Sequence, residues 1–167
     1  MNSQISSHWR PALGALLMVL SASAVLAQVQ YVPLKGSFEG RGTGVVQNGI
    51  LVANASGAGT ASLIGRFSYT LNATVALATG CGDGDFQLVA ANRDVITGSF
   101  VGCGGPTDTP NVGHIVEVMT ITGGTGRFRD ATGGFTFDRL VDQTNLPAFD
   151  LTSGSLTGTI STPGSTR

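Results

Sequence analysis

The chain has little charge, and what it has is nearly balanced. Charged residues make up 11% of the 167 residues, the net charge is -1, and Lys35 is the single lysine. A protein that binds nucleic acid needs a basic stripe to displace counterions from phosphates. No such stripe exists here, so we do not expect nucleic acid as a partner.

Long apolar runs are also missing. The most apolar segment covers residues 11–20 and follows Arg10, and it is shorter than the roughly 20 residues that a membrane-spanning helix needs. Small residues follow at 21–27, with Val25 and Ala27 before the expected cut, which is typical of a secretory signal peptide. A membrane anchor is the alternative. We expect residues 1–27 to be a cleaved signal peptide and residues 28–167 to form one secreted or periplasmic domain without a transmembrane segment.

Helical periodicity is almost absent, and alternation with period two takes its place. Within residues 62–78 the odd positions include Phe67, Tyr69 and Leu71, while polar residues occupy most even positions. This long segment is expected to curve, or to break near Gly65. The strands expected along the chain are 36–41, 45–54, 62–78, 86–91, 95–101, 114–122, 134–141 and 151–161.

About eight short strands without helices fit either a sandwich or an up-and-down barrel. Closure removes exposed strand edges, which matters in a chain with one lysine to protect them. We therefore predict an all-β fold, an eight-stranded antiparallel β-barrel.

Cysteine is scarce as well. Cys81 and Cys103 flank two expected strands, and a turn at residues 92 and 93 places them opposite each other at the base of the hairpin. A zinc site would need about four ligands, whereas residues 28–167 offer these two cysteines and His114. We predict a disulfide and no metal, and we interpret the acidic glycine-rich residues 82–85 as a turn.

The glycine-rich segment 121–128 follows a strand, as dinucleotide-binding loops do. In those proteins a helix and a complete βαβ unit come next, whereas here residues 133–137 resume a strand. We therefore expect no nucleotide and no other cofactor.

Residues 122–133, TGGTGRFRDATG, and the Phe-rich strand after them resemble the signature of the dirigent and allene oxide cyclase barrel superfamily, particularly its secreted bacterial relatives. Residues 59–67 (GTASLIGRF), 90–100 (AANRDVITGSF) and 158–161 are similar to those relatives too. Together these stretches span most of residues 28–167.

The resemblance implies an eight-stranded antiparallel barrel whose lumen holds a small hydrophobic molecule, often in a trimer. Gly123, Gly124 and Gly126 are expected to turn the backbone with positive φ, while Phe128 fills an apolar gap under the loop. In well-studied relatives, acids, Arg and Tyr in the lumen direct cyclisation or radical coupling. Those positions lie outside the matched motif, so no catalytic residue is transferred to this chain.

Two charged residues stand on otherwise apolar strand faces, which is typical of a functional lumen. If the loop is centred near Phe128, Glu117 lies directly opposite Arg139. A structural ion pair or an exposed sheet face is the alternative. His114 stands alone at the start of a strand and is expected at the surface or rim, which argues against hydrolase and metalloenzyme chemistry. The candidate lumen residues are Glu117, Arg139, Phe135, Phe137, Met119 and Tyr69.

Two functions remain open at this point. The first is a secreted barrel that binds a small hydrophobic ligand, with or without guiding a cyclisation or isomerisation. The second is a noncatalytic structural or surface-interaction protein whose barrel is filled by its own side chains. A cavity of about 300 Å³ or more with convergent polar groups favours the first.

Overall fold

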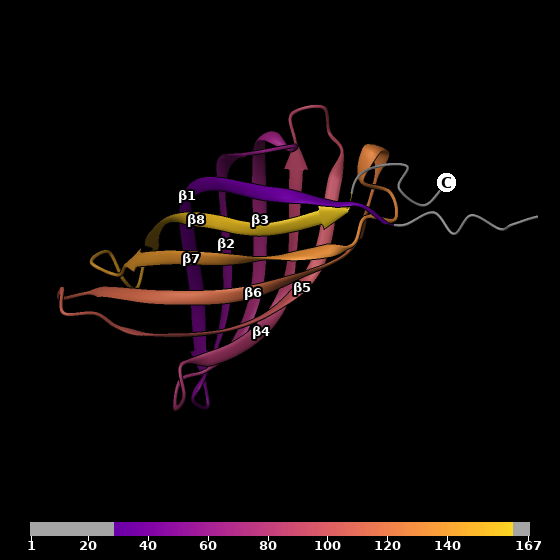
Figure 1. The fold of residues 1–167 in the computed structure, drawn as a ribbon. Helices are drawn as coiled ribbons and strands as arrows, with labels where there is room; N and C mark the ends of the chain where they lie inside the picture. The colour runs from indigo at the N-terminus through magenta and orange to yellow at the C-terminus, as the bar shows by residue number, and fades with distance from the viewer. Residues whose placement is uncertain (1–28, 162–167) are drawn as a thin grey trace, which may run out of the picture.

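The computed structural model describes residues 29–161, so the predicted signal peptide lies outside the described residues. Each strand pairs antiparallel with the next, and the last strand pairs with the first, which confirms the closed eight-stranded antiparallel barrel (Figure 1). Within residues 29–161, no helix has the length and apolar character needed to cross a membrane. The strands are β1 (Tyr31–Gln47), β2 (Ile50–Ala61), β3 (Gly65–Ala76), β4 (Cys81–Ala90), β5 (Val95–Pro106), β6 (Val112–Gly124), β7 (Gly133–Asp142) and β8 (Asp150–Ser161).

Alternation of side chains decides which residues enter the barrel. On β3 the side chains of Phe67, Tyr69 and Leu71 are buried, and the residues between them are exposed. The strand begins at Gly65 after a turn at residues 62–64, so the long apolar segment is broken near Gly65 as expected. Period-two patterning therefore located both the strand and its inner face.

The single strand expected at residues 45–54 is wrong. β1 ends at Gln47 and β2 begins at Ile50, with the turn residues Asn48 and Gly49 at φ values of 51° and 78°. Positive φ at both central residues is the geometry of a two-residue hairpin turn whose twist matches the strands. β2 also continues through Ala61, beyond the predicted end. The prediction stopped too early because the inner residues of this part of the strand are glycine and alanine, which conceal the alternation that marks a strand.

The turn expected at residues 82–85 is a second error. These residues lie inside β4, where Gly84 pairs with Ala73 of β3 and Phe100 of β5. A Cβ at Gly84 would stand 2.7 Å from the Phe100 ring, so the glycine makes room for an aromatic side chain rather than for a turn.

One end of the barrel interior is tightly packed, and we call it the packed end. The rings of Phe38 and Phe137 stack with centroids 4.1 Å apart, and Tyr69 meets Phe38 edge-on at 5.4 Å. Such offset and edge-to-face pairs add to the stabilisation that burial of the rings provides. The remaining large buried side chains at this end include Leu34, Phe67, Leu88, Ile96, Met119, Ile121, Phe135, Leu156 and Ile160.

The glycine-rich segment closes the packed end. Gly123 and Gly124 are the last residues of β6, and Gly126 starts a 3₁₀ turn (Gly126–Phe128) with φ 57°. Gly124 does not share the positive φ expected of it, because it continues the strand. The Phe128 side chain is 3% exposed and packs in the core, where it closes this end.

The disulfide predicted between Cys81 and Cys103 is confirmed. The two residues are direct partners across β4 and β5, with a Cα–Cα distance of 4.0 Å, and no free cysteine occurs in residues 29–161. Gly102 next to Cys103 faces inward against Glu117, so the disulfide lies on the outer side of the sheet.

We expect loss of this disulfide to lower the free energy of unfolding by about 3 kcal/mol. The two cysteines are separated by 22 residues in the sequence, so the cross-link closes a loop that restricts the unfolded chain. Chemical denaturation of a Cys81→Ala/Cys103→Ala variant measures the loss. Reductant should lower the stability of the parent protein by a similar amount and leave the double variant unchanged. A reductant-insensitive parent would contradict the prediction.

Candidate functional site

A cavity of ≈ 560 Å³ opens at the end of the barrel opposite the packed end. Four hairpin connections lie at this end of the barrel, which we call the mouth, and three of them contribute residues to the cavity lining: those between β3 and β4, β5 and β6, and β7 and β8. The mouth loops are tied to each other, since the backbone N–H of Gln143 donates to the carbonyl oxygen of Asn111 at 2.8 Å. All eight strands contribute lining residues, so the cavity is the unfilled part of the lumen.

Small inner residues create this cavity. The inward positions at this end of β1 to β5 hold mainly glycine and alanine, where the packed end holds aromatic and large aliphatic side chains. The barrel circumference is set by strand number and register, so small residues leave volume rather than drawing the walls together. The small lining residues on these strands include Gly42, Ala53, Ala55, Ala73, Gly82 and Gly102.

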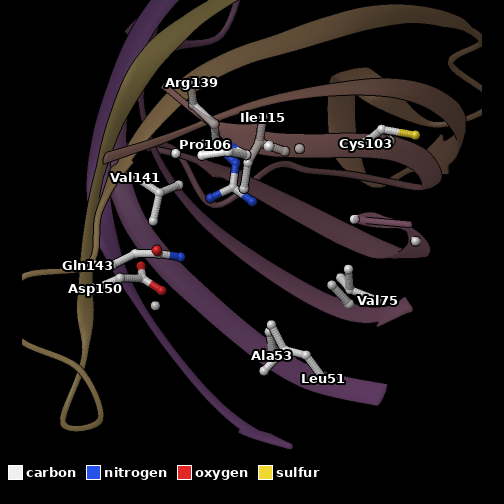
Figure 2. Close-up of a pocket in the computed structure, with 18 of the residues that line it drawn as sticks. Leu51, Ala53, Val75, Cys103, Pro106, Ile115, Arg139, Val141, Gln143 and Asp150 are labelled. Atoms are coloured by element: carbon white, nitrogen blue, oxygen red, sulfur yellow. The ribbon is translucent and has the colours of Figure 1, made fainter. Parts of the chain in front are cut away.

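The cavity walls are chemically divided. Figure 2 shows the aliphatic side chains of Leu51, Ala53 and Val75 on one side. Arg139 and Asp150 direct their polar ends into the cavity from the other side (Figure 2). A mostly apolar site with a few converging polar groups is the usual form of a small-molecule pocket.

Glu117 and Arg139 form a buried, two-point ion pair on the cavity wall. Arg139 Nε donates to Glu117 Oε2 at 2.9 Å, and Nη2 donates to Oε1 at 2.8 Å. The side chains of Arg139 and Glu117 are only 10% and 5% exposed. Thr152 stands beside the pair, with its Oγ1 3.4 Å from Arg139 Nη1. The pair is therefore held in one geometry from β6, β7 and β8.

The expected register of this pair was wrong by two residues. Glu117 lies opposite Phe137, and Arg139 lies opposite Ile115, so the charged residues are diagonal neighbours. The connection between β6 and β7 is centred at residue 127 rather than at Phe128, because the last pair of the two strands is Ile121 with Gly133, and Gly123 and Gly124 pair only with β5. A shift of two keeps both side chains on the inner face, and long side chains reach across that diagonal.

Glycines on the neighbouring strands give the ion pair its space. A Cβ at Gly102 of β5 would stand 2.7 Å from Glu117 Cγ. A Cβ at Gly154 of β8 would stand 2.8 Å from Arg139 Cβ. Each is closer than real Cβ contacts come, so a side chain at either position would displace the pair.

Tyr69 brings a neutral phenol close to this pair. Its side chain is 2% exposed, and the hydroxyl finds no hydrogen-bond partner among residues 29–161. The hydroxyl lies against Gly40, where a Cβ would collide with it. Burial raises the pKa of Tyr69 to about 12; the Arg139 charge opposes this shift, and the Glu117 charge adds to it. The Tyr69 hydroxyl is thus a hydrogen-bond donor without a partner among residues 29–161, and its pKa depends on the charges of Arg139 and Glu117.

Asp150 is a cavity residue that sequence reasoning missed. It is the first residue of β8 and lies opposite Gly42 of β1, whose backbone N–H donates to its carboxyl group. Burial raises the pKa of Asp150, while the Arg139 charge and the Gly42 hydrogen bond act against that rise. The expected strand began one residue later. The alternation along β8 could have located it, since Asp150 is an even-numbered residue, like the buried residues Thr152 and Leu156, and therefore lies on the inner face of the strand.

The six candidate lumen residues all point into the barrel, but they divide into two groups. Glu117 and Arg139 line the cavity. The other four belong to the packed end, each no more than 3% exposed, so they fill the lumen rather than line the cavity: Phe135, Phe137, Met119 and Tyr69.

His114 lies outside the site. It is exposed, and its Nε2 is 2.7 Å from Asp138 Oδ1 across β6 and β7. Among residues 29–161, no group of three or more His, Cys, Asp or Glu side chains is placed to hold a metal ion. The surface position is the one expected from the sequence.

No protein-family model, no curated protein and no solved structure matches this chain.

Separating the buried ion pair should destabilise the fold. Glu117→Gln and Arg139→Met each leave a buried charge without its partner, which costs about 3–5 kcal/mol of unfolding free energy. The double variant should lose less than the sum of the two, because it leaves no charge unpaired. Urea denaturation measures all three, with exposed Arg66→Met as the matched control. Unfolding of both single variants at the parent's urea concentration would refute the prediction.

Tyr69 should stay protonated well above the ordinary range of tyrosine. In a Tyr31→Phe variant it is the last of the two tyrosines in the chain, so the phenolate absorbance reports on it alone. We expect its titration near pH 12. Because the unfolded chain ionises at about 10, the stability of the fold should fall as the pH rises between these values. Titration at the ordinary tyrosine value in the folded protein would show that the hydroxyl is not buried.

Proposed function

We propose that this barrel binds a small, largely apolar molecule in its open-ended cavity. The observation that carries the proposal is the ≈ 560 Å³ space with aliphatic side chains on one wall and Glu117, Arg139 and Asp150 on the other. Small-molecule sites typically have about 300–1,000 Å³, mostly apolar walls and a few fixed polar groups. Such a ligand would bury its apolar body against Leu51 and Val75 and orient its polar group toward the charged wall.

Membership of the dirigent and allene oxide cyclase barrel superfamily is part of the same proposal. It is supported by the resemblance of residues 122–133 and by the eight-stranded barrel. Guidance of a cyclisation or isomerisation would use groups that hold a reactive molecule in one conformation. The Glu117–Arg139 pair lines the cavity and is held by two hydrogen bonds, so it has the rigidity that such guidance needs.

A purely structural barrel is the competing function. The packed end fits that function, since its lumen is filled by the protein's own side chains. A barrel selected only for stability would fill the other end as well, because unfilled volume forfeits packing contacts. Glycine and alanine at those inner positions, together with a carboxylate whose burial raises its pKa, favour binding.

The compartment and the assembly complete the proposal. The Cys81–Cys103 disulfide supports an oxidising location, secreted or periplasmic, as the signal-like residues 1–27 predict. A trimer remains an expectation of the resemblance. The outer faces of β5 and β6 expose Val101, Val116 and Val118, which is apolar area that such an assembly would cover.

The cavity can be tested by filling it. Ala53→Phe places a ring inside the lumen, while Val52→Phe places the same ring on the outer face of the same strand. We expect the neutral apolar fluorophore N-phenylnaphthylamine to bind the parent and Val52→Phe, and to lose most of its binding to Ala53→Phe. Native mass spectrometry of the three proteins, each produced in cells of the protein's own source, should show a retained small molecule on the parent and on Val52→Phe. The molecule should be missing from Ala53→Phe.

Each outcome decides the proposal. Equal fluorophore binding by all three proteins would place binding outside the cavity and refute the proposal. Absence of binding to the folded parent, with no retained molecule in native mass spectrometry, would favour the structural function instead.

A further inference from the structure

The charges that face the cavity do not balance. Three of the residues that line it are charged: Glu117, Arg139 and Asp150. Both oxygens of Glu117 accept hydrogen bonds from Arg139, so these two charges largely cancel. Asp150 receives its hydrogen bond from a backbone N–H and from no side chain of residues 29–161. One guanidinium therefore faces two carboxylates, and one negative charge remains uncompensated.

Asp150 is placed where a ligand can reach it. The missing side chain of Gly42 leaves room for the carboxyl group, since a Cβ there would stand 2.5 Å from Asp150 Oδ1. Figure 2 shows the carboxylate directed into the cavity, across from Leu51 and Ala53. A molecule lying on the aliphatic wall would present its polar end to Asp150.

Electrostatics in such a partly dry space discriminates strongly between ligand charges, because the low effective dielectric strengthens attraction and repulsion alike. A ligand carboxylate would meet the unpaired Asp150, and Arg139 is already engaged by Glu117. A protonated amine would form a charge-assisted hydrogen bond with Asp150 and compensate the buried charge.

We propose that the cavity selects a cationic amphiphile, an apolar molecule that carries a protonated amine, and that Asp150 is the residue that binds the amine. The inference rests on the proposed function, because it requires a ligand in the cavity. It adds the charge class of that ligand and the residue that recognises it.

Three ligands with the same alkyl chain test the charge preference. Decylamine, decanol and decanoate are each used to displace N-phenylnaphthylamine from the parent protein at neutral pH. Decylamine should displace the fluorophore at a concentration about tenfold lower than decanol, as one added charge-assisted hydrogen bond predicts. Decanoate should be the weakest of the three.

Two variants assign the preference to one residue. Asp150→Asn should bring decylamine to the level of decanol and leave decanol unchanged. Asp108→Asn removes the same charge from an exposed loop residue between β5 and β6 that does not line the cavity, so it should retain the full preference. Asp150→Asn removes a carboxylate whose burial raises its pKa, so the variant should fold at least as stably as the parent.

The results separate this inference from the function on which it rests. Binding of decanol with no preference for decylamine would overturn the amine inference and leave a ligand-binding barrel. A preference that persists in Asp150→Asn would overturn the role of Asp150. Failure of the fluorophore and of all three ligands to bind would overturn both proposals.

Discussion

Because β8 pairs with β1, the eight strands enclose a lumen of fixed circumference, and the inner residues of all strands must share it. A large side chain on one strand therefore requires a small one on its neighbour. Phe86 of β4 lies against Gly98 of β5, and Phe67 of β3 lies against Gly59 of β2. Where small residues coincide on several neighbouring strands, the same constraint leaves a cavity. The glycines that face aromatic rings inside the barrel are thus a consequence of closure.

The polar groups of the lumen lie at the boundary between its filled and unfilled parts. The Glu117–Arg139 pair gains nearly ideal hydrogen-bond geometry, but two desolvated charges stabilise a fold less than apolar side chains of the same volume would. The Tyr69 hydroxyl adds a donor without a partner among residues 29–161, and Asp150 adds a charge that its surroundings disfavour. Stability alone does not account for these groups, whereas the ligand binding proposed above would account for the ion pair and Asp150 on the cavity wall.

The sequence predicted the barrel well because alternation and turn chemistry are local signals. The faces of β3 followed from alternation along the strand, and the partnership of Cys81 with Cys103 followed from counting across the hairpin of β4 and β5. Errors arose where the local signal was weak. Small residues concealed β2, and the loop between β6 and β7 could not be centred from its residues alone. The cavity could not be predicted, because it depends on which small residues of five strands meet at one level of the barrel.

The division of the lumen has a consequence for how the molecule fluctuates. Backbone amides near Phe137 and Leu156 are surrounded by close-packed side chains, so their exchange with solvent requires opening of most of the barrel. The same strands reach the mouth beside open space, where a hairpin can separate from its neighbour at lower free-energy cost. Each strand thus has a slowly exchanging end and a rapidly exchanging end. An occupant of the cavity would supply contacts to the rapidly exchanging ends, so it would slow the exchange of amides near the mouth and leave the exchange at the packed end unchanged.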